Sequence, residues 1–113
     1  MKNTMNLFAR RLAVVLSVAA IGLASQASAE LDGAKLYIEK ICITCHGADA
    51  KTPIMPLYPK LAGQNYEYLK QQALDIKSGK RTNGMSSSMM GIAQMATDEE
   101  LDAIVKYIST LAP

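Results

Sequence analysis

The chain has 113 residues, of which 12 are basic and 10 acidic, for a formal net charge of +2 at pH 7. Three of the basic residues and none of the acidic ones lie in residues 1–29, so residues 30–113 carry a net charge of −1. This balance does not indicate a nucleic-acid-binding surface, which carries clustered positive charge, and we expect no nucleic-acid partner.

Residues 1–29 have the pattern of a secretory signal peptide. The segment begins with three positive residues, Lys2, Arg10 and Arg11. An apolar run over 12–23 and the small-residue motif Ala27-Ser28-Ala29 follow. The alternative is an uncleaved membrane anchor, but a run of about 12 residues is shorter than the ~20 that span a bilayer. We therefore expect cleavage before Glu30, a single domain over 30–113, a periplasmic location and no stable membrane insertion.

A first helix is expected over residues 33–46. Asp32 is a good N-cap, and Leu31 and Leu36 are spaced as a hydrophobic staple. Its apolar stripe is expected to comprise Ala34, Tyr37, Ile38 and Ile41. The helix leads directly into the most informative motif of the chain.

This motif is Cys42-Ile43-Thr44-Cys45-His46, the sequence form of a covalent c-type haem attachment site. Residues three apart lie on one side of a helical turn, so Cys42 and Cys45 can each form a thioether with a vinyl group of one haem. His46 is then placed to bind the iron as the proximal ligand. The motif predicts one covalent haem c.

Three other interpretations of the two cysteines are weaker. A thioredoxin-like redox pair needs a βαβ surround, and no strand pattern flanks Cys42. A zinc site needs further ligands, whereas the chain has only two cysteines and one histidine. A disulfide between cysteines three apart closes a very small loop and gives little entropic stabilisation.

The central part of the chain combines a proline-rich loop and a second helix. The loop over 48–63 contains Pro53, Pro56 and Pro59, which exclude a regular helix or central strand. Its apolar residues are expected to pack on the haem: Ile54, Met55, Leu57, Tyr58 and Leu61. A helix is expected from an Asn65 N-cap to Gly79, with an inner stripe of Tyr66, Leu69, Ala73 and Ile76. Arg81 follows this helix, as a solvated cation or as the partner of a haem propionate.

A loop rich in Gly, Ser and Met is expected over 82–96, before the last helix. It contains Met85, Met89, Met90 and Met95. Such methionines are usually core filler, but a haem protein with one histidine needs a second iron ligand. Met95 is expected to pack in the core. Thr97 and Glu100 form a capping box at the start of a helix whose apolar stripe is Leu101, Ile104, Val105, Ile108 and Leu111.

Several segments resemble the small bacterial class I cytochromes c, most closely one half of a dihaem cytochrome c4, with cytochrome c5 nearby. They are Tyr58–Gln64, Ser78–Thr82, the methionine stretch and Thr97–Leu101. The resemblance implies an all-α cytochrome c fold, with three main helices and loops around one haem. It also implies terminal helices that cross through Gly33 and Tyr37 against Tyr107.

The resemblance further implies His/Met ligation of the iron. The family's methionine ligand lies about eight residues before the cap of the last helix, which selects Met89, with Met90 as the alternative. By the same likeness, the carbonyl of Pro56 would accept the proton on the far nitrogen of His46 and orient the ring.

These observations predict a non-enzymatic, periplasmic electron carrier that exchanges single electrons with redox protein partners. One alternative is a non-catalytic haem subunit of a periplasmic dehydrogenase, such as a flavoenzyme that oxidises sulfur compounds. Another is an enzyme or gas sensor in which no methionine binds the iron.

Overall fold

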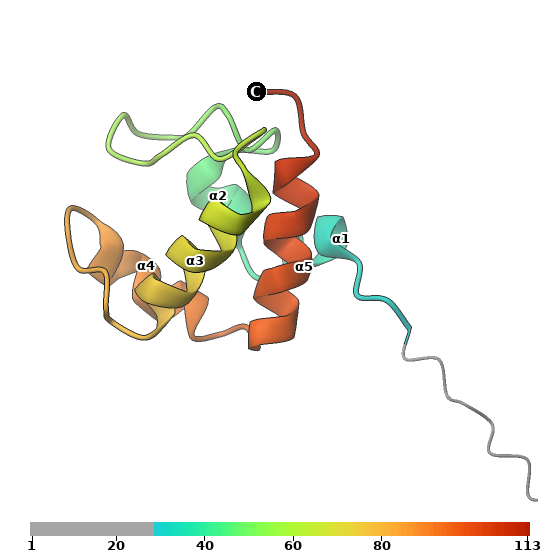
Figure 1. The fold of residues 1–113 in the computed structure, drawn as a ribbon. Helices are drawn as coiled ribbons and strands as arrows, with labels where there is room; N and C mark the ends of the chain where they lie inside the picture. The colour runs from blue at the N-terminus through green and yellow to red at the C-terminus, as the bar shows by residue number, and fades with distance from the viewer. Residues whose placement is uncertain (1–28) are drawn as a thin grey trace, which may run out of the picture.

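The computed structural model describes residues 29–113, which form five helices and no strand (Figure 1). The helices are α1 (Gly33–Glu39), α2 (Cys42–His46), α3 (Tyr66–Lys77), α4 (Ser86–Ala93) and α5 (Asp98–Ser109). This confirms the all-α prediction. The predicted signal peptide lies outside the described residues, apart from its last position. No helix within 29–113 is long and apolar enough to cross a membrane.

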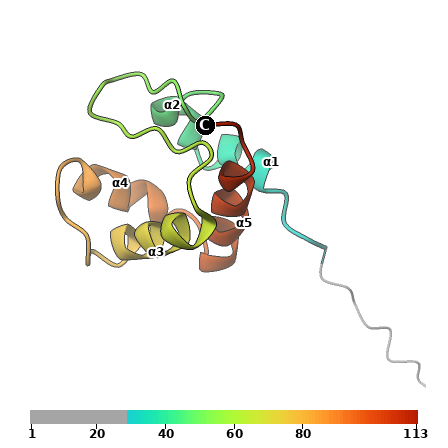
Figure 2. The same ribbon diagram turned by 45° about the horizontal axis from the view of Figure 1, so that its top comes forward.

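Helix α1 packs across α5 at a very short distance, and Figures 1 and 2 both show the two side by side. Gly33 makes this approach possible, because a Cβ there would lie 2.1 Å from the Ala103 carbonyl oxygen and 2.8 Å from the Tyr107 Cβ. One turn later the rings of Tyr37 and Tyr107 meet, with centroids 6.0 Å apart and planes inclined by 60°. The predicted crossing of the terminal helices is confirmed.

The main apolar core lies where α1, α3 and α5 meet. Its buried members include Leu36, Tyr37, Leu69, Ile104, Val105 and Ile108. On α5 these residues recur every three or four positions, so one face of the helix is apolar while its first turn is acidic. The predicted capping box is present: Thr97 accepts from the Glu100 N–H, and Glu100 accepts from the Thr97 N–H.

Helix α3 lies between α5 and α4, as Figure 2 shows, and both neighbours pack against it. It begins as predicted, with the Asn65 side chain accepting from the Tyr68 N–H, and Leu69 on its inner face is buried. A second, smaller cluster joins this helix to α4 and α5. It consists of Ala93, Ala96 and Leu101, with Ile76 and Met89 packed against it.

The predicted helix over 33–46 is instead two helices. Lys40 caps α1, and Ile41 then adopts a left-handed φ of 57°, which turns the chain before α2 begins. A β-branched residue rarely takes this conformation, so the sequence contains no signal for the break. The break also reorients the apolar stripe: Ile38 is 60% exposed, whereas Leu36 and Tyr37 form the buried face of α1.

Helix α4 occupies part of the stretch that was expected to be a loop. Its N-cap, Met85, makes no side-chain capping bond, and Gly91 in its interior weakens the helical propensity. The helix is held instead by packing of Ala93 and Met89 in the second cluster. Tertiary burial commonly outweighs propensity in this way, and the sequence pattern alone did not reveal it.

Gly33→Ala tests the helix crossing. The added methyl group would overlap the Ala103 carbonyl, so α1 must move away from α5, and we expect a loss of about 1–3 kcal/mol or more in the free energy of unfolding. Chemical denaturation of the haem-loaded protein measures this loss. Lys35→Ala is a control on the exposed face of α1 and should stay within about 0.5 kcal/mol of wild type. Equal stability of the Gly33→Ala and Lys35→Ala proteins would contradict the crossing.

The Tyr37 side chain is almost completely buried, and its hydroxyl donates to the Gly47 carbonyl at 2.7 Å. Gly47 directly follows His46, so this bond joins the core of the helix crossing to the end of α2. Burial is the main cause that raises the pKa of Tyr37 well above its ordinary value of 10.0. The neutral phenol is therefore favoured by folding.

Tyr37→Phe should lower the free energy of unfolding by about 1 kcal/mol at neutral pH, because the Gly47 carbonyl loses its donor. The folded state holds the phenol proton more tightly than the unfolded state, so Tyr37 contributes fully below pH 10.0 and less as the pH rises above it. Denaturation at several pH values should show wild type losing stability above that pH and the variant losing less. Tyr68→Phe, at an exposed position, should behave like wild type.

Candidate functional site

The candidate site is built on the single turn of α2. Cys42 and His46 are buried and Cys45 is half-buried, and both thiols are free of disulfide bonds. Gly47 ends the helix with a φ of +83°, where a Cβ would lie 2.2 Å from the Thr52 carbonyl oxygen. A glycine is therefore needed for the chain to leave α2 and turn into the loop that follows.

The His46 side chain is 5% exposed and has one clear protein partner. Its Nδ1 lies 2.9 Å from the carbonyl oxygen of Pro59, and because a carbonyl can only accept, Nδ1–H is the donor. The prediction that Pro56 supplies this carbonyl is therefore wrong, because the next proline of the loop, Pro59, supplies it. The bond sets the tautomer of His46 and leaves Nε2 available for a metal.

The path of the loop explains why Pro59 takes this role. Pro56 lies in an exposed turn that the Tyr58 N–H closes by donating to the Met55 carbonyl. After this turn the chain runs back towards α2, where the N–H groups of Leu61 and Ala62 both donate to the Ala50 carbonyl. The returning segment brings Pro59, rather than the tip of the loop, to His46. Nothing in the spacing of three similar prolines predicts which one returns.

The ionisation of the site suits a metal ligand better than a thiol redox centre. Burial lowers the pKa of His46 below its ordinary 6.5, which favours the neutral imidazole that metals bind. Burial also raises the pKa of the Cys42 thiol to about 11. A reactive CxxC pair needs a thiol with a lowered pKa, so the thioredoxin-like interpretation has no support at Cys42.

The candidate methionines take different positions around α4. Met89 is half-buried in the second cluster, and Met90 is also half-buried, with its sulfur 3.5 Å from where a Cβ on Gly79 would lie. Met85 and Met95 are exposed, so the expectation that Met95 packs in the core is wrong. Helix geometry places both Met89 and Met90 beside the buried residues of α4.

Arg81 is half-buried at the end of α3. Its guanidinium donates to the side-chain oxygens of Gln72 and Asn83, each at 3.0 Å. These contacts use two of its five N–H donors. The apolar loop residues Ile54, Met55 and Leu57 are exposed.

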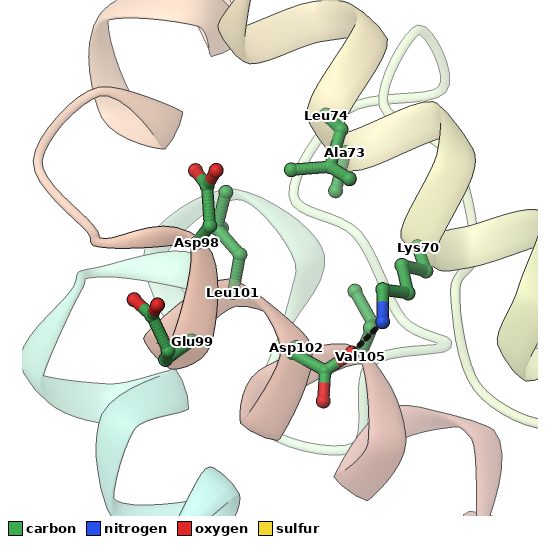
Figure 3. A pocket seen from close by; sticks show the side chains of 8 residues that line it. All are labelled: Lys70, Ala73, Leu74, Asp98, Glu99, Leu101, Asp102 and Val105. Carbon is green, nitrogen blue, oxygen red and sulfur yellow. Dashed lines mark ion pairs between the residues drawn. The ribbon is translucent and has the colours of Figure 1, made fainter.

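A cavity of about 300 Å³ opens between α3 and α5 (Figure 3), and it is separate from the candidate site. Its lining is Lys70, Ala73, Leu74, Asp98, Glu99, Leu101, Asp102 and Val105. Lys70 pairs with Asp102 at 2.8 Å, and the Tyr66 hydroxyl donates to the same carboxylate. None of the predicted site residues lines this cavity.

The residues of the site fit a covalently bound haem c. Two free cysteines share one helical turn, and the adjacent histidine is buried, oriented and presented with one nitrogen available. Sequence reasoning found these three residues from their spacing. It missed Pro59 and the bond between Tyr37 and Gly47, since both depend on how separate segments fold back on α2.

Comparison with known proteins also indicates a haem-binding chain. The Cytochrome c family model matches residues 31–112. The chain is 38% identical to a thiosulfate dehydrogenase electron acceptor from Stutzerimonas stutzeri, over 83% of this chain and 45% of the relative. It is 43% identical to a cytochrome c4 from Pseudomonas aeruginosa, over 62% of this chain and 33% of the relative.

The chain thus spans less than half the length of these two relatives. A cytochrome c-553 from Nitratidesulfovibrio vulgaris is 31% identical over 90% of this chain and 99% of its own length. Proteins of this family bind haem c covalently, and Cys42, Cys45 and His46 form the corresponding CxxCH motif. The family match, the all-helical architecture and this motif together show that the chain belongs to the class I c-type cytochromes.

Proposed function

We propose that this protein transfers single electrons through one haem that Cys42 and Cys45 would hold covalently, with His46 and Met89 as the residues that would bind its iron. The observation that carries the proposal is the α2 turn, in which a buried His46 is oriented by the Pro59 carbonyl beside two free cysteines. When bound, the haem would supply iron that alternates between the ferrous and ferric states.

The residues of the chain would then limit how much the site moves during electron transfer. Two thioethers from one short helix would hold one ring edge, and the Pro59 carbonyl would hold the imidazole. A methionine ligand would raise the reduction potential relative to a second histidine. The site would thus tune a potential, without a role in transforming a substrate.

Met89 is favoured as the distal ligand by its register relative to the Thr97 cap and by its half-buried place on α4. Met90 is the alternative, because it is the next residue of α4 and is also half-buried. Arg81 is a candidate partner for a haem propionate, since its guanidinium retains donors beyond those used by Gln72 and Asn83.

The proposed context is the bacterial periplasm, reached through the signal peptide of residues 1–29, with redox proteins as donor and acceptor. The named relatives are cytochromes that carry electrons, and we extend this to the absence of catalysis in the present chain. Residues 30–113 would be the mature domain.

A second candidate function is that of a haem subunit bound to a periplasmic dehydrogenase. It is favoured by two relatives whose names describe electron acceptors of thiosulfate dehydrogenase, from Stutzerimonas stutzeri and Thiomonas intermedia. A subunit should co-purify with its dehydrogenase in a fixed ratio. A free carrier should purify alone and accept electrons from more than one partner.

Production with a c-type maturation system tests both the signal peptide and the covalent cofactor. The mature protein should begin at Glu30, and its mass should equal residues 30–113 plus one haem that resists acid-acetone extraction. Mass spectrometry of the intact protein measures both. An extractable haem would refute covalent attachment, whereas a retained leader would refute only the cleavage site.

Replacement of each of the four methionines by leucine identifies the distal ligand, since leucine keeps most of the volume and lacks the sulfur. Met89→Leu should abolish the sulfur-to-iron charge-transfer band of the ferric protein, lower the reduction potential and let carbon monoxide bind the ferrous iron. Met85→Leu and Met95→Leu are matched controls at exposed positions and should keep the band.

If only Met90→Leu loses the band, the ligand register is wrong by one residue. If all four variants keep the spectrum of wild type, the His/Met model is wrong, and the interpretation as an open-site enzyme or gas sensor replaces it.

A further inference from the structure

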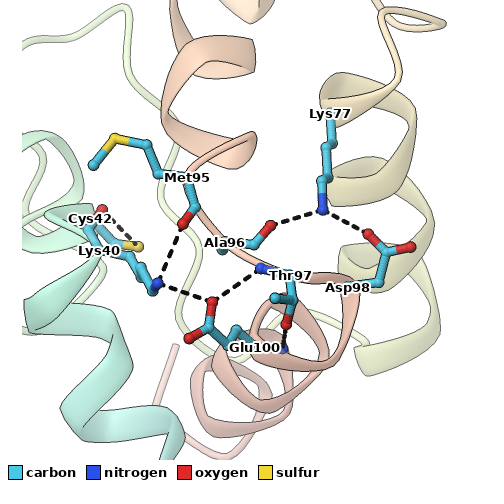
Figure 4. A network of polar contacts seen from close by, with 8 residues as sticks. All are labelled: Lys40, Cys42, Lys77, Met95, Ala96, Thr97, Asp98 and Glu100. Atoms are coloured by element: carbon cyan, nitrogen blue, oxygen red, sulfur yellow. Dashed lines mark hydrogen bonds and ion pairs between the residues drawn. The ribbon is translucent and has the colours of Figure 1, made fainter.

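Two lysines hold the connection between α4 and α5 from opposite sides (Figure 4). The Lys40 ammonium donates to the Met95 carbonyl at 3.2 Å and pairs with Glu100 at 2.8 Å. The Lys77 ammonium, from the last position of α3, donates to the Ala96 carbonyl at 2.7 Å and to Asp98 at the same distance. Both lysines thus bind a main-chain carbonyl of the connection and an acidic residue in the first turn of α5.

Lys40 belongs to the segment that leads into the haem attachment helix. It is the C-cap of α1 and lies two residues before Cys42, whose Sγ is 3.9 Å from the Lys40 carbonyl. One residue therefore joins the segment that leads into the haem attachment helix to the segment that leaves α4. No other side chain from residues 29–40 makes a hydrogen bond or ion pair to this connection among the described residues.

The pair of Lys40 and Glu100 is better shielded than the other ion pairs of α1 and α5. Both side chains are 22% exposed. By contrast, the pair of Lys106 and Glu30 is 65% and 88% exposed. Glu100 also accepts from the Thr97 N–H at 2.9 Å, so its carboxylate is fixed by the capping box. A shielded and prearranged pair is weakened less by salt and by side-chain entropy than an exposed one.

Helix α4 is restrained less at its N-terminal end, where Asn83 accepts a bond from Arg81 at 3.0 Å. Its N-cap, Met85, makes no side-chain capping bond, and residues 82–85 are exposed. At its C-terminal end, Gln94 donates to the Lys77 carbonyl at 3.3 Å, and the two lysines hold the next residues. The connection to α5 is therefore the better anchored end of the helix that carries Met89 and Met90.

We propose that Lys40 is a positioning residue for the distal iron ligand, with Lys77 as its counterpart. Lys40 fixes the α4–α5 connection to the segment before Cys42. It thereby limits how far α4 and its methionine can move relative to the haem attachment helix. This inference rests on the proposed function only in that the distal ligand comes from α4. It holds equally for Met89 and Met90.

The test measures how often the methionine leaves the iron. Imidazole binds ferric haem only after the methionine has left, so its binding rate at saturating concentration reports the release rate. The charged hydrogen bonds lost in Lys40→Leu should make binding about tenfold faster, and Lys77→Leu should act in the same direction. Lys40→Arg retains the charge and donors and should restore most of the wild-type rate.

Lys106→Leu is the matched control, because its ion pair lies away from the connection, and it should leave the rate unchanged. Ile108→Val controls for general loss of stability, since it removes a buried methyl group from the main core and makes no contact to the α4–α5 connection through a polar group. If Ile108→Val accelerates imidazole binding as much as Lys40→Leu, the role of Lys40 is only structural and the proposal is overturned. An unchanged rate in Lys40→Leu overturns it as well.

Glu100→Gln is a second variant for the case in which Lys40→Leu does not fold. It keeps an oxygen that can accept from the Thr97 N–H but removes the charge opposite Lys40, so it should also accelerate imidazole binding. Equal rates for this variant and wild type would then overturn the proposal. Failure of the proposed function looks different, because the wild-type ferric protein itself would lack the sulfur-to-iron band.

Discussion

Tyr37 links the crossing of α1 and α5 to the haem attachment helix. Its ring packs against Tyr107 where α1 crosses α5, and its hydroxyl donates to the carbonyl of Gly47 directly after His46. The close crossing is possible only because Gly33 has no side chain. One side chain therefore packs in the core and also holds the residue at which the CxxCH helix ends.

The proximal side of the site is assembled from α2 and the loop that returns to it. Helix α2 is a single turn between a left-handed Ile41 and a left-handed Gly47, so its position depends on contacts made by its neighbours. The Pro59 carbonyl, the Ala50 carbonyl and the Cys45 carbonyl each accept a bond that joins the loop to itself or to α2. These main-chain contacts explain how a loop with three prolines can hold a histidine ring in one orientation.

The distal side is organised differently, by side chains and charge. Helix α4 has weak intrinsic signals, and it is placed by burial of Ala93 and Met89 and by the lysine contacts to the residues after it. The proposed methionine ligand on this helix would therefore be tuned through residues from other segments, such as Lys40. The proximal and distal halves meet at Lys40, where α1 ends and the attachment segment begins.

Local sequence signals were sufficient to predict the haem attachment motif and most of the helical architecture. The spacing of Cys42, Cys45 and His46 specifies one helical turn, and the caps at Asn65 and Thr97 mark helix starts that the structure reproduces, because these signals act within a few residues. The apolar periodicity of residues 66–76 and 101–111 likewise predicted the inner faces of α3 and α5.

Features that depend on contacts between distant segments could not be predicted and are seen only in the folded chain. The first predicted helix ends before Ile41, and part of the methionine stretch forms α4. The partner of His46 is Pro59 and not Pro56. In each case the local sequence permits more than one conformation. Burial and hydrogen bonds to residues far away in the chain determine which conformation forms, and a local sequence pattern contains no information about these contacts.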